Sequence, residues 1–201
     1  MRVEIATPSG AAVVELDRPR TPARALLLLT HGAGGGVETA DVSAVRAAAL
    51  KAGIAVARVT QPYRAAGRRT PPAPPRQDEA WLAVVAGLRR RRTLAALPLI
   101  AGGRSNGARL ACRTAHPSGA VGVVALAFPL HPPGKPEKSR LAELDGAGVP
   151  VLVVQGDRDP FGMPPPGPDR EVVVIAGADH ALRRELPRVA ETVVDFIGRL
   201  T

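Results

Sequence analysis

The segment Gly103-Arg104-Ser105-Asn106-Gly107 combines a potential nucleophile with the residues of a sharp turn. It matches the pattern Gly-x-Ser-x-Gly, in which a strand turns into a helix and exposes the serine hydroxyl at the edge of a sheet. The glycines suit this turn because side chains there would collide with neighbouring backbone. The same pattern also occurs in plain glycine-rich turns, but here an apolar segment precedes it and a helical segment follows. We therefore predict that Ser105 is a catalytic nucleophile.

His180 is the candidate general base for this serine. It ends the segment Gly177-Ala178-Asp179-His180, which lies between the last predicted strand and the last predicted helix. With Ser105 as the nucleophile, an aspartate of residues 157–159 as the acid and His180 as the base, the chain order is that of α/β-hydrolases.

Two aspartates are candidates for the acid that orients His180. Asp157 and Asp159 both follow an apolar strand predicted over residues 149–155. We prefer Asp159, because it lies farther into the loop, where the acid of a triad usually stands. Asp157 is then a turn residue. The alternative is that both aspartates serve only to form the turn. Asp179 is expected to be a loop or cap residue, because adjacent residues rarely reach each other's side chains well.

A glycine-rich loop, His31-Gly32-Ala33-Gly34-Gly35-Gly36, follows another apolar strand and supplies backbone donors. In this type of fold, one N–H of such a loop and the N–H after the nucleophile bind the oxyanion. We assign these donors to Ala33 and Asn106. The loop lacks the glycine spacing and the lysine of nucleotide-binding loops, so no nucleotide is expected. His31 is expected to hydrogen-bond the loop rather than to catalyse.

The elements that must position these residues follow from the hydrophobic pattern. Strands are predicted at residues 3–7, 11–17, 24–30, 54–60, 97–101, 120–127, 149–155 and 171–176. Helices are predicted at residues 39–52, 77–91, 139–145 and 185–200, with a further one from the serine motif to about residue 115. A strand pair followed by repeated strand–helix units is typical of an α/β fold with a mostly parallel sheet and helices on both faces. Ligands bind at the carboxyl ends of such strands, where the candidate residues lie.

The length of 201 residues fits one α/β-hydrolase domain over residues 1–201, without room for a large lid. The pocket is therefore expected to be shallow or open and to suit a small acyl group. Residues 61–76, rich in Pro, Gly and Arg, are predicted to form a loop that is either mobile or a short extended cover. The candidates for the pocket wall are Tyr63, Arg64, Arg104 and His131.

The chain is strongly basic, with a net charge of +9 and a pI of about 11.2. Such a charge raises the question of nucleic acid. Abundant Arg, Ala, Gly and Pro favour a compositional origin instead, and the one dense basic run, residues 89–92, ends a predicted helix without interleaved aromatic residues. We expect no nucleic-acid partner, and the oligomeric state is left open.

Several further classes are not favoured by the composition. No apolar run reaches the roughly 18 residues of a membrane span, and the first residues lack a secretory signal, so a cytoplasmic protein with no membrane partner is expected. The single cysteine, Cys112, cannot form an internal disulfide. No His, Asp or Glu cluster has the spacing of metal ligands, and hydrolysis through a serine needs no cofactor.

Five segments carry a family resemblance: residues 29–34, 102–105, 128–138, 155–162 and 177–180. Through them, almost the full chain resembles a small α/β-hydrolase-like family that includes testis-expressed hydrolase-like proteins, bacterial relatives and a regulatory subunit of a histone acetyltransferase complex. More broadly it is similar to dienelactone-hydrolase-like enzymes. The resemblance implies a triad of Ser105, Asp159 and His180. Asn106 departs from the bulkier residue, often Met, that this family would have there.

These observations predict a serine hydrolase that acts on a small ester or related acyl substrate through an acyl-enzyme. The alternative is a non-catalytic interaction module with the same fold that binds a protein or a polyanion, as the chromatin-associated relative suggests. Acyl transfer to an acceptor other than water is a third possibility.

Overall fold

The sheet of the protein, described for residues 1–201 by a computed structural model, has eight strands in the order β1-β2-β4-β3-β5-β6-β7-β8. The strands are β1 (Arg2–Thr7), β2 (Gly10–Asp17), β3 (Ala25–Thr30), β4 (Ile54–Thr60), β5 (Leu99–Arg104), β6 (Ala120–Leu126), β7 (Val151–Gly156) and β8 (Arg170–Ile175). The hairpin β1–β2 is antiparallel and joins β4 antiparallel, and every other neighbouring pair is parallel. The predicted α/β fold with a mostly parallel sheet is confirmed.

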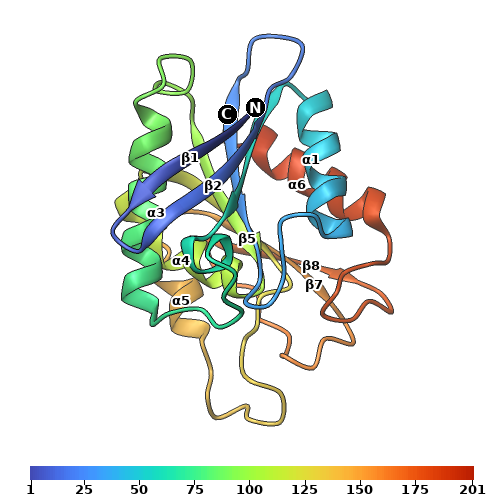
Figure 1. The fold of residues 1–201 in the computed structure, drawn as a ribbon. Helices are drawn as coiled ribbons and strands as arrows, with labels where there is room; N and C mark the ends of the chain where they lie inside the picture. Colours follow the sequence, from blue (N-terminus) through green and yellow to red (C-terminus); the bar gives the residue numbers. More distant parts are fainter.

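Helices cover both faces of this sheet (Figure 1). On one side lie α1 (Ala40–Lys51) and α6 (Leu186–Gly198), and on the other lie α3 (Pro74–Arg89), α4 (Asn106–Ser118) and α5 (Leu141–Asp145). A single turn, α2 (Pro62–Ala65), follows β4. No helix is long and apolar enough to cross a membrane.

The central strand β3 shows why the sheet is buried on both faces. Every one of its residues is buried. Leu26 and Leu28 join the hydrophobic cluster under α3 and α4, whereas Leu27 and Leu29 join the one under α1 and α6. Alternate side chains of a strand point to opposite faces, so a continuous run of leucines fills both layers.

The structure differs from the predicted elements mainly around residues 61–76. The predicted loop contains α2, and α3 begins at Pro74 rather than at Gln77. Both helices start with proline, whose fixed φ and missing N–H suit the first helical positions. The segment between them is therefore a short connection between two helices, not one extended loop.

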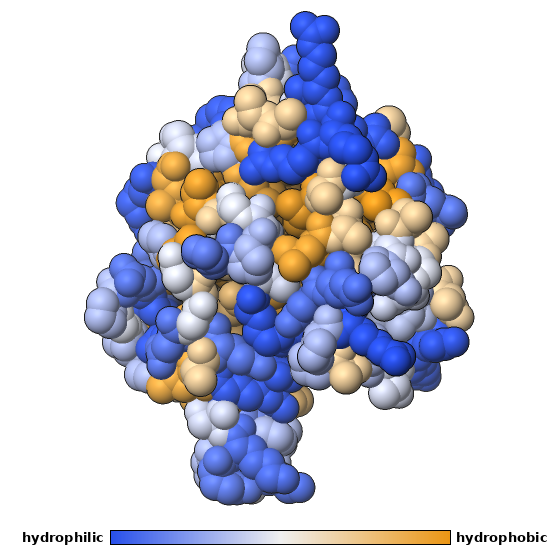
Figure 2. Space-filling model, turned by 90° about the vertical axis from the view of Figure 1, so that its left-hand side faces the viewer, coloured by the Kyte–Doolittle hydropathy of each residue, from blue (hydrophilic) through white to orange (hydrophobic).

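The carboxyl ends of the parallel strands lie at the lower end of the molecule in Figure 1. The segment after β6, residues 127–140, has no helix or strand and projects from this end. Its tip is hydrophilic (Figure 2). The proline-rich segment of the sequence thus forms a polar lobe beside the strand ends that carry the candidate residues.

Candidate active site

Ser105 stands at a turn where β5 ends and α4 begins. Its backbone has φ 54° and ψ −116°, a conformation that residues other than glycine rarely adopt. A Cβ on Gly103 would lie 2.6 Å from the carbonyl carbon of Gly107, and one on Gly107 would lie 2.7 Å from the Thr30 oxygen. The two glycines of the motif are therefore required by the close approach of strand, turn and helix.

His180 lies in the loop after β8 and contacts both other residues of the predicted triad. Its Nε2 is 2.9 Å from Ser105 Oγ, and its Nδ1 is 2.8 Å from Asp159 Oδ2. A carboxylate can only accept, so Nδ1 carries the proton and Nε2 is left to accept from the serine hydroxyl. The Phe161 ring lies against the imidazole, with ring centroids 4.3 Å apart and planes at 34°.

Asp159 has a fully buried carboxylate. Besides His180, it accepts hydrogen bonds from Gln155 Nε2 and from the backbone N–H of Phe161, both at 2.9 Å. Asp157 lies elsewhere: its Oδ1 accepts from the backbone N–H of Gly177 at 2.7 Å. Of the two candidate aspartates, the structure therefore brings Asp159 to the histidine and leaves Asp157 in the turn.

Gln155 and Phe161 are neighbours of the site to which the sequence patterns gave no role. Gln155 Nε2 also donates to the carbonyl oxygens of Phe128 at 3.2 Å and Gly162 at 2.9 Å, which ties the end of β7 to two loops. Its Oε1 is buried without a partner. A polar residue that closes an otherwise apolar buried strand is the sequence signal that marks Gln155.

Arg104 extends from the end of β5 toward the histidine loop. Its Nε lies 3.0 Å from Asp41 Oδ2, and its Nη2 donates to the backbone carbonyl of His180. The Asp41 side chain is fully buried in the first turn of α1. Arg104, a predicted pocket residue, thus holds the loop of the histidine against α1. Nothing in the sequence pattern paired it with Asp41.

The glycine-rich loop follows β3, which pairs directly with β5, so it lies beside Ser105 as its motif requires. The backbone N–H of Ala33 makes no hydrogen bond within the protein. Asn106 is the first residue of α4, and the N–H groups of a first helical turn have no partner within the helix. Both predicted oxyanion donors are therefore free to bind a ligand.

His31 and Tyr63 hold this loop in place. His31 Nδ1 donates to the Gly32 carbonyl at 2.8 Å, and its Nε2 accepts from the Gln61 backbone N–H at 3.0 Å. A ring that donates at Nδ1 and accepts at Nε2 is in its neutral form, and burial lowers the pKa of His31. The Tyr63 hydroxyl donates to the Ala33 carbonyl at 2.8 Å, and burial raises its pKa to about 12.

The other predicted pocket residues also make contacts of their own. Arg64 Nε donates to the Gly35 carbonyl at 3.0 Å. His131 Nδ1 bonds the Pro132 carbonyl at 2.9 Å, and its ring packs on Gly162. Arg64 therefore supports the glycine-rich loop, and His131 supports the loop that contains Phe161.

A cavity of about 510 Å³ lies between the β1–β2 turn, the end of β4, α2 and α3. Of the four predicted pocket residues, only Tyr63 lines it. No residue of the candidate triad lines this cavity, so the shallow or open substrate pocket expected beside Ser105 stays a prediction. No group of three or more His, Cys, Asp or Glu side chains is placed to hold a metal ion.

The sheet order and the serine turn define an α/β-hydrolase. A family model described as an alpha/beta hydrolase domain matches residues 23–190, so the chain belongs to the α/β-hydrolase family. Comparison with curated proteins gives no match.

Solved structures share this fold over nearly the whole chain. Est1E from Butyrivibrio proteoclasticus has a TM-score of 0.79 at 18% identity, with 99% of this chain and 98% of that chain covered. An α/β serine hydrolase without a lid from Xanthomonas campestris has a TM-score of 0.78 at 19% identity, covering 99% and 94%. A dienelactone hydrolase from Anabaena variabilis has a TM-score of 0.78 at 16% identity, covering 100% and 97%. At these identities the likeness establishes the fold.

Proposed function

We propose that this chain is a serine hydrolase that cleaves small carboxylic esters through an acyl-enzyme on Ser105. The observation that carries the proposal is the continuous hydrogen-bonded series from Ser105 through His180 to Asp159, with distances of 2.9 and 2.8 Å. Such a series activates a serine hydroxyl that is otherwise a weak nucleophile.

In the first half of the reaction, His180 Nε2 takes the proton of Ser105 as its Oγ attacks the carbonyl carbon of the ester. The buried carboxylate of Asp159 stabilises the imidazolium that forms. The protonated His180 then gives its proton to the leaving alcohol, and an acyl group remains on Ser105.

In the second half, His180 takes a proton from water, and the resulting hydroxide attacks the acyl carbonyl. Ser105 Oγ leaves and recovers its proton from His180, so the carboxylic acid is released and the enzyme is regenerated. In both halves the N–H groups of Ala33 and Asn106 bind the oxyanion. The serine hydrolase and the dienelactone hydrolase among the structural neighbours support carboxylic esters as the first substrate class to test.

A fluorophosphonate probe tests the proposal before any natural substrate is known. We expect the wild type to be labelled and to hydrolyse p-nitrophenyl acetate, and Ser105→Ala to lose both properties completely. Turnover unchanged in Ser105→Ala would refute the assignment. An unlabelled wild type that binds DNA in a salt-sensitive way would instead favour the non-catalytic interaction module.

A further inference from the structure

The half-buried phenyl ring of Phe161 packs on the imidazole of His180, with ring centroids 4.3 Å apart and planes at 34°. We propose that Phe161 is a positioning residue for the triad, whose ring fixes the tilt of the imidazole between Ser105 and Asp159. The inference rests on the proposed hydrolase function, and it gives a role in the reaction to a residue outside the triad and the oxyanion donors.

The two hydrogen bonds of His180 hold only the edge of its ring. Nδ1 lies 2.8 Å from Asp159 Oδ2, and Nε2 lies 2.9 Å from Ser105 Oγ. Hydrogen bonds weaken steeply only at large departures from linearity, so these two oppose a small tilt of the ring weakly. A second ring packed against the imidazole opposes the tilt by direct contact. Small displacements of a catalytic group are costly, so this contact affects the rate.

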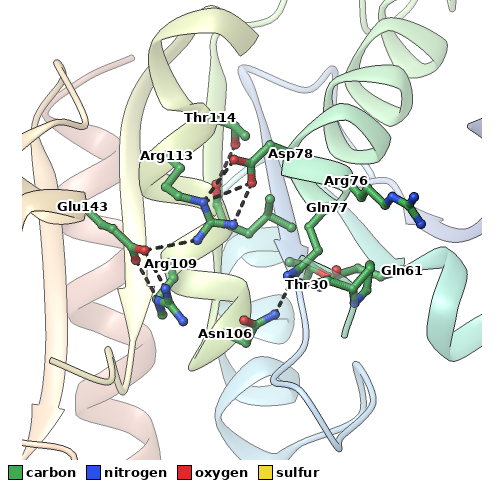
Figure 3. A network of polar contacts seen from close by, with 12 residues as sticks. Thr30, Gln61, Arg76, Gln77, Asp78, Asn106, Arg109, Arg113, Thr114 and Glu143 are labelled. Carbon is green, nitrogen blue, oxygen red and sulfur yellow. Dashed lines mark hydrogen bonds and ion pairs between the residues drawn. The ribbon is translucent and has the colours of Figure 1, made fainter. Parts of the chain in front are cut away.

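Ser105 is fixed by a separate set of contacts, made by the helix that follows it. Asn106 Nδ2 donates to Gln77 Oε1 at 2.7 Å, which ties the first residue of α4 to α3 (Figure 3). Further along α4, Arg113 Nη2 lies 2.7 Å from Asp78 Oδ1 of α3 (Figure 3). Neither contact involves the loop after β8 that carries the candidate base. That loop therefore needs contacts of its own to keep the base aligned with the serine.

Backbone contacts hold Phe161 in place on the other side. Its N–H donates to Asp159 Oδ1 at 2.9 Å, and its carbonyl accepts from the backbone N–H of His131 at 3.0 Å. The next residue, Gly162, has φ 91°, and its carbonyl accepts from Gln155 Nε2 at 2.9 Å. A Cβ on Gly162 would collide with the His131 ring. The turn that carries Phe161 is therefore packed closely against His131.

His131 belongs to the polar lobe of residues 127–140, so the lobe supplies part of this support. Arg140 closes the lobe at its base. Its backbone N–H donates to the Leu130 carbonyl at 2.7 Å, and its Nη1 donates to the Pro129 carbonyl at 2.9 Å. The proline-rich segment of the sequence, to which the proposed reaction gives no role, thereby holds Phe161 against the candidate base.

The Phe161 ring also favours the charged form of the base. The face of a phenyl ring is electron-rich and attracts a cation that lies within about 6 Å of its centroid. His180 becomes an imidazolium as Ser105 attacks the ester, and again as water attacks the acyl group. The ring therefore stabilises the transition states more than the ground state, an effect that raises kcat rather than tightens substrate binding.

Two variants separate the ring from its apolar volume. Phe161→Leu keeps an apolar side chain but removes the ring, and Phe161→Tyr keeps the ring. We expect Phe161→Leu to lower both kcat for p-nitrophenyl acetate and the rate constant of fluorophosphonate labelling about tenfold, since His180 acts in every step. KM should stay within about twofold of the wild type, and Phe161→Tyr should bring both rates to within about threefold of it. Phe161→Met repeats the test if the leucine variant does not fold.

A matched control and a spectroscopic signal distinguish position from stability. Phe196→Leu makes the same change in the core beside Gly122, at the start of β6, so it should lower the urea midpoint and leave the labelling rate unchanged. The Nδ1 proton of His180, donated to the buried Asp159 carboxylate, should give a low-field NMR signal in the wild type and in Phe161→Tyr. In Phe161→Leu this signal should broaden through faster exchange with water.

The outcomes separate this inference from the proposed function. Labelling and turnover of Phe161→Leu at wild-type rates would overturn the positioning role and leave the hydrolase intact. Equal losses in the leucine and tyrosine variants, or a raised KM with kcat unchanged, would also overturn it, because the ring would then not act through His180. An unlabelled wild type would refute the hydrolase itself.

Discussion

The guanidinium of Arg104 links the fully buried carboxylate of Asp41, 3.0 Å from its Nε, to the backbone carbonyl of His180. The residue directly before the candidate nucleophile therefore also positions the loop of the candidate base. The Arg104 side chain thus connects strand β5 to the loop after β8, and the Asp41 carboxylate of α1 supplies the charge that orients it.

Replacement of Arg104 by methionine tests this link. Arg104→Met keeps the length of the side chain but leaves Asp41 buried and unpaired, which should lower the free energy of unfolding by about 3–5 kcal/mol. The loss of the bond to the His180 carbonyl should lower kcat by about 10²-fold, because small displacements of a catalytic group are costly. Urea unfolding and steady-state kinetics measure the two effects.

The double variant Asp41→Asn/Arg104→Met is the control for stability alone. It removes the unpaired charge, so most of the lost stability should return while kcat stays low. Recovery of kcat together with stability would mean that Arg104 acts only through folding and not through the position of His180.

Asp159 and Asp157 should respond very differently to the same substitution. Asp159→Asn places an amide opposite His180 Nδ1 and favours the wrong tautomer, so kcat should fall by about 10³–10⁴-fold. Asp157→Asn keeps an oxygen for the Gly177 N–H, and kcat should stay within about twofold of the wild type. Equal losses in p-nitrophenyl acetate hydrolysis would contradict the assignment of the acid.

His31 should titrate below its ordinary pKa of 6.5, because burial disfavours its charged form. The unfolded chain binds a proton there as the pH falls below 6.5 while the folded chain does not. Stability linked to this group is therefore present above pH 6.5 and is lost as the pH falls toward the folded pKa. NMR titration of the four imidazoles, with His31→Asn for assignment, should show this signal moving below pH 6.5; a midpoint at or above that value would exclude the effect of burial.

Local patterns were sufficient to predict the sheet and most of its elements. The continuous leucines of residues 25–30 predict a strand buried on both faces, and the structure confirms it. Strand β4 lies over residues 54–60 as predicted. When hydrophobic residues must both follow a fixed spacing and be buried, few other secondary-structure assignments are possible. These two strand predictions are therefore confirmed.

Contacts between distant segments were beyond the reach of such patterns. The Arg104–Asp41 pair spans 63 residues, and no local rule relates its members. Likewise the cavity lined by Trp81 depends on where the segment between α2 and α3 lies. The prolines at the start of α3 led the sequence pattern to predict a loop there. The sequence places candidate residues at strand ends, but only tertiary packing determines which side chains support them.

The backbone conformation of Ser105, with φ 54° and ψ −116°, has a consequence for folding as well as for reactivity. A side chain in this region costs about 1–3 kcal/mol, a cost that glycine avoids. Ser105→Gly and Ser105→Ala are both expected to be inactive, yet the glycine variant should unfold at a higher denaturant concentration than the alanine variant and the wild type. In that case the strained turn that exposes the Ser105 hydroxyl makes the protein less stable than the same fold with glycine at this position.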